Sequence, residues 1–351
     1  MNLLTLLQEL CLVPAPSGQE GALRELIAAK IEPFCQDYRQ DRSGNLQAWL
    51  GTGQKPCLML DAHMDEVGVM VQSLEDNGCL RLTPLGGLDA RLAPGSRVLL
   101  LGGQGQRING IIGLAPPHVA AKNEFLPAWE DLYLDIGAGG RCEAQALGAE
   151  IGACGVLDAG QGMIGKDGFF ARNLDDRVGC ALLIWLLEEL AGQDLPYRLC
   201  FNFSSAEEVG LRGAAGAAFH IAPDLALVLE ATVGDTPGLV SYRHPSLLGQ
   251  GPAITVMDGR QIVPRELVLS LERAARRAGV TSQRKRPPFG GTDGGAIALS
   301  RAGVPTAVLS IPTRYIHSPV SWLRLADLEA GAALIKTWIL HHCPLGGIDG
   351  D

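Results

Sequence analysis

Residues that could bind a metal ion or move a proton stand at the ends of several apolar segments of this chain. Five separate segments carry them: DAHMDE with His63 and Asp65, NLDDR with Asp175 and Asp176, SSAEE with Glu207 and Glu208, LVLEAT with Glu230, and IPTRYIHSP with His317. Taken singly, each has a simpler explanation, such as a helix N-cap for Asp175. Because every segment delivers an imidazole or a carboxylate and none delivers a Cys, we predict that they form one shared metal site.

The chemistry of this set favours a site for two divalent ions. Imidazole and carboxylate ligands without thiolates suit zinc, cobalt or manganese. Two ions about 3.5–4 Å apart need roughly this number of ligands, with one carboxylate bridging them. The expected reaction is therefore metal-assisted hydrolysis, in which the ions lower the pKa of a bound water.

The spacing within two segments suggests a division of roles. His63 and Asp65 are two positions apart, so in an extended segment they point the same way, and Asp65 can orient the imidazole. Glu207 and Glu208 are neighbours, which point to opposite sides in an extended chain. One of them can bind a metal while the other faces the attacking water.

Other classes of enzyme, and a non-catalytic protein, are alternatives to this predicted metal-dependent hydrolase. No GxSxG or HExxH occurs, so a serine hydrolase elbow and a thermolysin-like zinc site lack support. An endoglucanase-like glycosidase needs two carboxyls facing each other about 5–9.5 Å apart, which adjacent glutamates pointing apart do not offer. A related dinuclear carboxypeptidase or amidohydrolase would use the same ligands. A non-catalytic binding or assembly protein of this fold would be marked by a lost ligand or base, and none is lost.

Composition and charge exclude some partners. The chain has 351 residues, a formal charge of -9 and 47% hydrophobic residues. Nucleic acid and anionic membranes require clustered Lys and Arg, so small substrates or peptides fit better. The longest uncharged apolar stretch, near CALLIWLL, is shorter than the roughly 20 residues of a membrane span. With no recognisable signal peptide and nine cysteines without a CxxC, we expect reduced thiols and a cytoplasmic location.

The elements that must position these residues alternate between helix and strand in two parts of the chain. Helical and strand patterns before Asp65 and after Gly165 predict a mostly parallel sheet with helices on both faces. Ser17 and Glu20 have the spacing of a capping box at the start of a helix. Between about Val67 and Gly165, short β-like pieces broken by Gly and Pro predict a small all-β unit. We therefore expect a discontinuous α/β domain of residues 1–66 and 166–351, with an inserted β-rich domain of residues 67–165.

Several motifs together resemble one known family of dinuclear metallopeptidases, the glutamyl or deblocking aminopeptidases, also called tetrahedral aminopeptidases. The motifs are SGQE, HMDEVG, GKDGFFARNLDDRVGC, SSAEEVGLRGA, GDTPG, GQGPAI, GGTDGGAI and SIPTRYIHSP. The resemblance runs from about Ser17 to Pro319. It implies a zinc-exopeptidase fold, an inserted barrel or PDZ-like domain used in dimerisation, and homodimers that assemble into a dodecamer.

The resemblance also implies a role for each matching residue. His63 and Glu230 would bind one ion, Glu208 and His317 the other, and Asp175 would bridge the two. Glu207 would be the general base and Asp65 would orient His63. The family implies a cis peptide bond between Asp175 and Asp176, and usually has Asp where this chain has Glu230.

Substrate preference depends on residues outside this set. Thr292 and Asp293 stand between paired glycines in FGGTDGG, at a turn that we expect to face the substrate. Arg314, Arg243 and Arg260 are candidates for attracting an acidic N-terminal residue, although each is equally compatible with a surface ion pair. The predicted function is a metal-dependent aminopeptidase that removes N-terminal residues from peptides.

Overall fold

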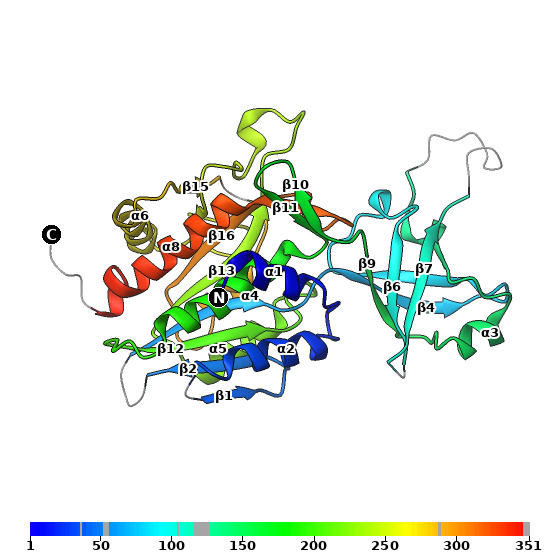
Figure 1. Ribbon diagram of the computed structural model, residues 1–351, viewed down its shortest axis with the longest axis horizontal. Helices are drawn as coiled ribbons and strands as arrows, with labels where there is room; N and C mark the ends of the chain where they lie inside the picture. Colours follow the sequence, from blue (N-terminus) through cyan, green and yellow to red (C-terminus); the bar gives the residue numbers. More distant parts are fainter. Residues whose placement is uncertain (36, 52–55, 104, 116–125, 287–288, 347–351) are drawn as a thin grey trace.

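The computed structural model describes residues 1–346 except 36, 52–55, 104, 116–125 and 287–288. A large α/β body carries most of the chain, and a smaller β barrel projects from one side of it (Figure 1). Two connections cross between the bodies, one after β3 (Cys57–His63) and one before β10 (Gly162–Ile164). The barrel is therefore an insertion into the larger domain.

The centre of the large sheet is parallel. Its strand order is β1-β2-β12-β3-β13-β16-β17-β11-β10, and β12 (Arg198–Ser204), β3, β13 (Leu225–Val233) and β16 (Thr306–Arg314) pair in parallel. Every residue of β3 is buried. A strand covered on both faces must be apolar on both, which explains the continuous apolar runs in these segments.

The outer strands of the sheet are antiparallel to their neighbours. They are β1 (Asp37–Gln40) and β2 (Leu46–Leu50) at one edge, and β17 (Ser321–Arg324), β11 (Gly168–Ala171) and β10 at the other. Two short strands, β14 (Ala253–Thr255) and β15 (Gln283–Lys285), pair with each other, and β14 also pairs with β16.

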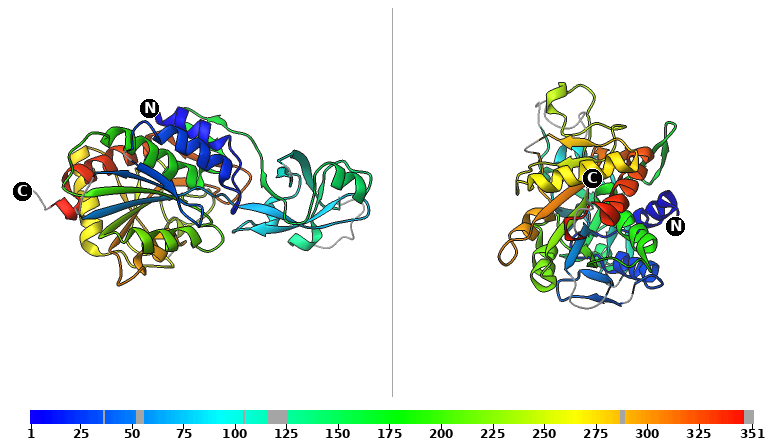
Figure 2. Two further views of the ribbon diagram at one scale, coloured as in Figure 1. Left: turned by 90° about the horizontal axis from the view of Figure 1, so that it is seen from below. Right: turned by 90° about the vertical axis from the view of Figure 1, so that its left-hand side faces the viewer.

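Helices cover both faces of the sheet, as the alternation of helix and strand predicted (Figure 2). One apolar core joins the sheet to α1 (Leu3–Cys11), α2 (Gly21–Ile31), α4 (Leu174–Leu190), α6 (Arg265–Ala278) and α8 (Leu325–His341). A smaller core joins the opposite face to α5 (Arg212–Ile221) and α7 (Asp293–Ala298). Alternate strand residues enter the two cores: Leu58 and Leu60 pack on one side, Cys57 and Met59 on the other.

The inserted unit is a closed barrel with its own apolar core. Its strands are β4 (Gly68–Leu74), β5 (Leu80–Leu85), β6 (Arg97–Leu101), β7 (Arg107–Gly113), β8 (Tyr133–Asp135) and β9 (Cys154–Leu157). The unit is not entirely β, because it includes the short helix α3 (Arg141–Ala146). Its last strand ends at Leu157, before the boundary expected at residue 165, and β10 already pairs with β11 in the large sheet.

The start of α2 differs from the predicted capping box. Glu20 is the N-cap and makes no side-chain capping bond. Its carboxylate instead accepts the backbone amides of Gly18 and Ala206, while the Ser17 hydroxyl donates to Asp65. The side chains of Ser17 and Glu20 therefore bind residues that follow β3 and β12, because α2 begins next to the carboxyl ends of these strands. Among the helices in the described ranges, none is long and apolar enough to cross a membrane.

Candidate metal centre and substrate cavity

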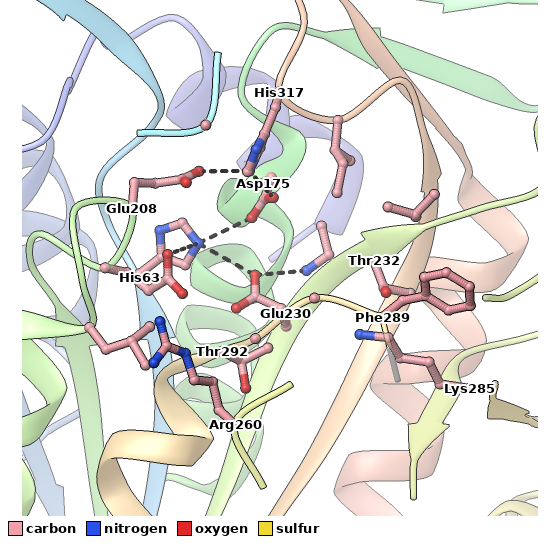
Figure 3. Close-up of a pocket in the computed structure, with 18 of the residues that line it drawn as sticks. His63, Asp175, Glu208, Glu230, Thr232, Arg260, Lys285, Phe289, Thr292 and His317 are labelled. Carbon is pink, nitrogen blue, oxygen red and sulfur yellow. Dashed lines mark hydrogen bonds and ion pairs between the residues drawn. The ribbon is translucent and has the colours of Figure 1, made fainter. Parts of the chain in front are cut away.

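The predicted ligands meet at the carboxyl ends of the parallel strands (Figure 3). His63 is the last residue of β3, and Glu230 lies in β13. His317 lies in the turn after β16, and Asp175 lies at the start of α4. Because neighbouring parallel strands end at one edge of a sheet, segments more than a hundred positions apart in sequence converge here.

Asp175 lies between the two histidines. Its Oδ1 is 3.1 Å from Nε2 of His63, and its Oδ2 is 3.3 Å from Nε2 of His317. Nε2 of His63 is also 3.4 Å from Oε1 of Glu230, and Nε2 of His317 is 3.1 Å from Oε1 of Glu208. Two possible ligand groups result, His63–Asp175–Glu230 and Asp175–Glu208–His317, and they share one carboxylate.

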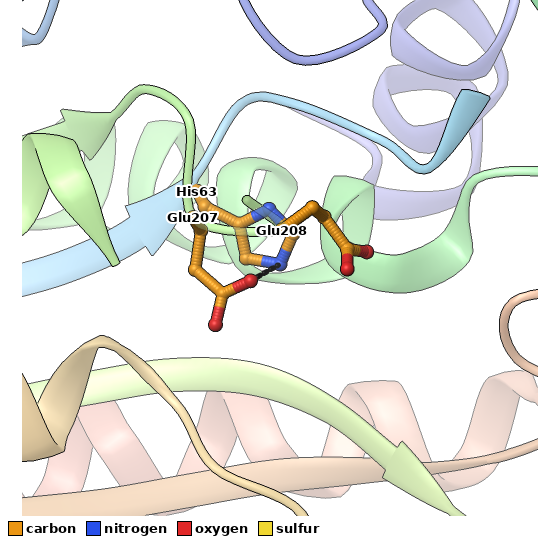
Figure 4. A group of neighbouring side chains, drawn as sticks. All are labelled: His63, Glu207 and Glu208. Atoms are coloured by element: carbon orange, nitrogen blue, oxygen red, sulfur yellow. Dashed lines mark ion pairs between the residues drawn. The ribbon is translucent and has the colours of Figure 1, made fainter. Parts of the chain in front are cut away.

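The two adjacent glutamates diverge, although not for the reason expected. They follow β12 in a turn rather than in an extended segment, and Ala206 before them has a positive φ of 54°. Oε2 of Glu207 lies 4.0 Å from Nε2 of His63 (Figure 4), whereas Oε1 of Glu208 lies 3.1 Å from Nε2 of His317 (Figure 3). His63, Glu207 and Glu208 also form a third possible ligand group. The turn, not strand alternation, separates the two carboxylates.

Asp65 connects His63 to the turn that carries the glutamates. Its Oδ1 is 3.3 Å from Nδ1 of His63 and accepts the backbone amide of Glu207 at 2.9 Å. Its Oδ2 accepts the amide of Glu208 at 3.2 Å and the hydroxyl of Ser17 at 2.5 Å. Burial opposes ionisation of Asp65, but these bonds and His63 hold its pKa below the usual value. Asp65 is thus a charged acceptor that fixes three parts of the site.

The charges of the site are crowded and buried. Burial lowers the pKa of both imidazoles, but adjacent carboxylates outweigh it, raising the pKa of His63 and raising that of His317 to about 11. Burial also raises the pKa of Glu230 to about 8, and raises those of Glu207 and Glu208. The side chains therefore retain protons that a divalent cation at the same place would displace.

The donor atoms fit the chemistry of divalent metal ions. Each of the two groups around Asp175 has one imidazole nitrogen and two carboxylate oxygens within 4.8 Å of one another. Zinc, cobalt and manganese accept such mixed nitrogen and oxygen ligands. The peptide bond between Asp175 and Asp176 is cis, in agreement with the resemblance described above.

A cavity of about 480 Å³ opens beside this group. All six predicted groups other than Asp65 line it: His63, Asp175, Glu207, Glu208, Glu230 and His317. Thr292 also lines it and begins α7 as its N-cap, accepting the amide of Gly294 at 3.3 Å. The cavity can hold part of a peptide next to the candidate ligands.

Three other predicted substrate residues lie elsewhere. Asp293 is buried and accepts the hydroxyl of Ser204 at 2.5 Å, behind the cavity wall. Arg314 forms an ion pair with Asp235, and its guanidinium lies 5.1 Å from the ring centre of Trp322. Neither residue lines the cavity, and Arg243 does not line it either.

Arg260, which was predicted as a candidate together with Arg314 and Arg243, does line the cavity, and so do Lys285 and Phe289, for which no role was predicted. Arg260 follows the turn after β14 and is exposed. Lys285, the last residue of β15, is only 3% exposed. In the sequence, Lys285 ends a short polar segment, QRK. Such a segment is typical of an exposed strand and does not indicate a buried cavity residue.

Known proteins resemble this chain along almost its whole length. The Pyrococcus furiosus lysyl aminopeptidase is 30% identical, covering 92% of this chain and 92% of its own. The Lactococcus lactis glutamyl aminopeptidase is 31% identical, covering 97% of this chain and 96% of its own. The two relatives thus share the aminopeptidase name but differ in the residue that it specifies.

Solved structures agree with the fold, and the family follows. The Pyrococcus horikoshii TET1 peptidase, described as assembling into a tetrahedron or a large octahedral shell, has a TM-score of 0.86 at 33% identity, covering 96% of this chain and 99% of its own. A Thermotoga maritima protein described as an endoglucanase has a TM-score of 0.78 at 32% identity, covering 95% of this chain and 96% of its own. The M42 glutamyl aminopeptidase family model matches residues 44–334. This chain belongs to the M42 glutamyl aminopeptidase family, a family of peptide-bond hydrolases.

Proposed function

We propose that this protein is a dinuclear metal-dependent aminopeptidase that hydrolyses the first peptide bond of peptides. The observation that carries the proposal is the position of Asp175, with one carboxylate oxygen toward His63 and the other toward His317. A carboxylate with an imidazole at each oxygen suits a bridge between two ions. The family membership supports the same reaction.

Each candidate ligand has a place in this scheme. His63 and Glu230 would hold one ion, Glu208 and His317 the other, and Asp175 both. Zinc is the preferred ion, and cobalt and manganese are alternatives with the same ligand chemistry. Bound ions of this kind lower the pKa of water and polarise a carbonyl. Glu230 is one methylene longer than the Asp usual in the family, so its reach can alter the metal preference.

Glu207 is proposed as the general base. Its carboxylate faces the cavity near His63, and it belongs to neither ligand group around Asp175. Burial raises its pKa, which makes the ionised form a stronger base. Glu207 would take a proton from the attacking water and return it to the leaving amine. Asp65 would hold the imidazole of His63 in position throughout.

Self-association through the barrel is part of the proposal. The barrel projects from the catalytic body and has its own core, so it can contact a second copy without disturbing the site (Figure 1). The relative from Pyrococcus horikoshii is described as assembling into a tetrahedron or a large octahedral shell. We propose a homodimer that assembles into a dodecamer, acting on peptides in the cytoplasm. All nine cysteines are free, which fits a reducing compartment.

The decisive experiment begins with protein stripped by a chelator. Activity is measured on a panel of aminoacyl p-nitroanilides before and after addition of zinc, cobalt or manganese. We expect no activity in the stripped protein and recovery with at least one ion. Hydrolysis confined to N-acetylated or other N-blocked peptides would contradict an aminopeptidase and favour the carboxypeptidase or amidohydrolase alternative.

One relative described as an endoglucanase makes a glycosidase the second candidate. A glycosidase would use two facing carboxyls and would not need the imidazoles of His63 and His317. Carboxymethyl cellulose is therefore included in the same panel. Cellulose hydrolysis that survives the chelator would support the glycosidase and contradict the proposal.

A further inference from the structure

We propose that Glu66 and Arg177 are positioning residues for the metal centre, and that their buried contacts fix the segment with His63 against the start of the helix with Asp175. The inference rests on the proposed dinuclear function and adds two residues to it. Both lie in segments that carry candidate ligands, HMDEVG and NLDDR. Neither is among the described residues that line the cavity, so they act through the ligands and do not touch the substrate.

Two of the candidate ligands come from distant segments and must keep their spacing. His63 ends β3, and Asp175 lies 112 positions later at the start of α4, with its Oδ1 3.1 Å from Nε2 of His63 (Figure 3). Asp175 also belongs to both ligand groups. Functional side chains must be held within roughly 0.5 Å of their working positions. Whatever fixes the end of β3 against the start of α4 therefore affects both ions.

Arg177 joins the start of α4 to the main chain around His63. Its side chain is fully buried. Its Nη1 donates to the carbonyl oxygen of Met64, and its Nη2 donates to that of Val13 at 3.2 Å. Three positions further along α4, Sγ of Cys180 donates to the carbonyl oxygen of His63 at 3.1 Å. Side chains of α4 are thus bonded to two successive carbonyl groups at the end of β3.

Glu66 accepts further donors from the same region. Its Oε1 is 3.0 Å from Nη2 of Arg177, accepts Nδ2 of Asn173 at 3.1 Å, and accepts the backbone amide of Ala15 at 3.0 Å. Its Oε2 accepts Nε of Arg172 at 2.8 Å. Glu66 is itself only 2% exposed. One buried carboxylate therefore binds three side chains from around the start of α4 and the loop after α1.

A buried ion pair contributes orientation more than stability. Removing two charges from water costs free energy that their attraction often does not repay, and well-packed apolar residues can replace such pairs without loss of stability. Apolar contacts have no preferred direction, whereas charge-assisted hydrogen bonds fix both distance and angle. The segments that Glu66 and Arg177 orient in this way are the ones that carry His63 and Asp175.

This network is distinct from the contacts of the neighbouring Asp65. Asp65 lies against the ring of His63 and accepts the backbone amides of Glu207 and Glu208, so it orients an imidazole and the turn with the glutamates. Glu66 instead binds side chains at the start of α4. Two adjacent carboxylates thus serve different parts of the centre, and Glu66 serves the part with the shared ligand.

The test uses protein that is freed of metal by a chelator and reloaded with manganese(II) alone. Two manganese ions that share a carboxylate are magnetically coupled, so electron paramagnetic resonance distinguishes a coupled pair from isolated ions. Glu66→Gln keeps the shape of the side chain and removes its charge. We expect this variant to lose the coupled signal of the wild type, and its calorimetric affinity for manganese to fall about 10–100-fold.

Two further variants provide a control and a milder change. Asp327→Asn alters another buried carboxylate, which accepts the amides of Gly249 and Gly251, and should keep the coupled signal. Asn173→Ala removes one donor to Glu66 and should lower the manganese affinity about threefold or more. Thermal unfolding shows which variants are folded at the temperature of measurement. If Glu66→Gln does not fold, an Asn173→Ala affinity equal to that of the wild type would overturn the proposal.

A double-variant cycle tests whether the two residues act as one unit. Arg177→Met should lose the coupled signal as Glu66→Gln does. The double variant should bind manganese within about twofold of the weaker single variant, because either change already breaks the pair. Fully additive losses of affinity would contradict a shared role.

The outcomes separate this proposal from the proposed function. A wild type that binds a single manganese ion, or two without coupling, would contradict the dinuclear function itself. A coupled wild type with the same signal and affinity in Glu66→Gln would overturn only the role of Glu66 and Arg177. An equal loss of coupling in Asp327→Asn would also overturn that role, because any altered buried carboxylate would then disturb the centre.

Discussion

The backbone amide of Glu207 donates a 2.9 Å hydrogen bond to Oδ1 of Asp65. The two residues are 142 positions apart and follow neighbouring parallel strands. The same Asp65 oxygen lies 3.3 Å from Nδ1 of His63. Nδ1 of His63 also lies 3.1 Å from the backbone carbonyl oxygen of Asp65. One buried residue therefore contacts both a candidate ligand and the backbone of the candidate base.

Asp65→Asn tests these contacts. The substitution removes the negative charge beside His63. It also replaces one of the two carboxylate oxygens, each of which accepts a backbone N–H, with an NH2 group that cannot accept a hydrogen bond. We expect metal affinity or kcat to fall by about 10–100-fold. Calorimetric titration of metal-free protein and steady-state kinetics measure the two effects. Ser17→Ala, which removes a single donor to Asp65, is the milder control; equal losses in both variants would contradict the central role of the carboxylate.

Glu207→Gln should separate chemistry from metal binding. The amide has nearly the shape of the carboxylate but cannot accept a proton from water. We expect kcat to fall by about 10²–10⁴-fold while the metal content stays that of the wild type. Elemental analysis of the dialysed variant and single-turnover kinetics provide the measurements. Full activity of Glu207→Gln would show that another group takes the proton.

Asp175→Ala and Glu230→Ala should differ in the number of ions that they lose. Asp175 belongs to both ligand groups, so its removal should reduce binding of both ions, whereas loss of Glu230 should remove about one of two. Elemental analysis after dialysis gives the stoichiometry. Asp327→Asn is the matched control, because this buried carboxylate accepts the amides of Gly249 and Gly251. A control with the same metal loss would indicate general destabilisation instead.

The stability of the metal-free protein should fall as the pH rises from about 5 to 9. The folded-state pKa of Glu230 is raised by burial to about 8, and that of His317 is raised by Asp175 and Glu208 to about 11. Between the unfolded and folded pKa values, the native state binds more protons than the unfolded chain, so raising the pH removes stability. The lowered pKa of Asp175 has the opposite sign, but its effect is complete below this window.

Thermal unfolding at pH 5.5 and pH 8.5 checks this prediction. The metal-free protein should have the lower Tm at pH 8.5. Added zinc should raise the Tm at both pH values, and more at the higher one, because the ions bind ionised carboxylates and neutral imidazoles. A metal-free Tm that rises with pH would mean that other groups dominate the proton balance.

Local sequence patterns determined much of the fold. Continuous apolar runs such as LCFNF and LVLEAT can be buried on both sides, so they predict the parallel strands β12 and β13. Breaks at Gly and Pro indicated the inserted β unit, and residue chemistry at the strand ends indicated the metal ligands. These features depend on the types of residues close together in the chain, which is why they could be predicted without coordinates.

Tertiary structure decided which local signals were used, and how. The capping-box pattern of Ser17 and Glu20 serves the neighbouring strand ends, because the sheet brings Asp65 and Ala206 within hydrogen-bonding reach. Glu207 and Glu208 diverge because of a turn with a left-handed residue, a conformation that the pattern EE does not specify. Arg314 forms an ion pair with Asp235, whereas Lys285 is buried at the cavity wall. Burial and pairing depend on which distant segments pack together, and no spacing within the sequence contains that information.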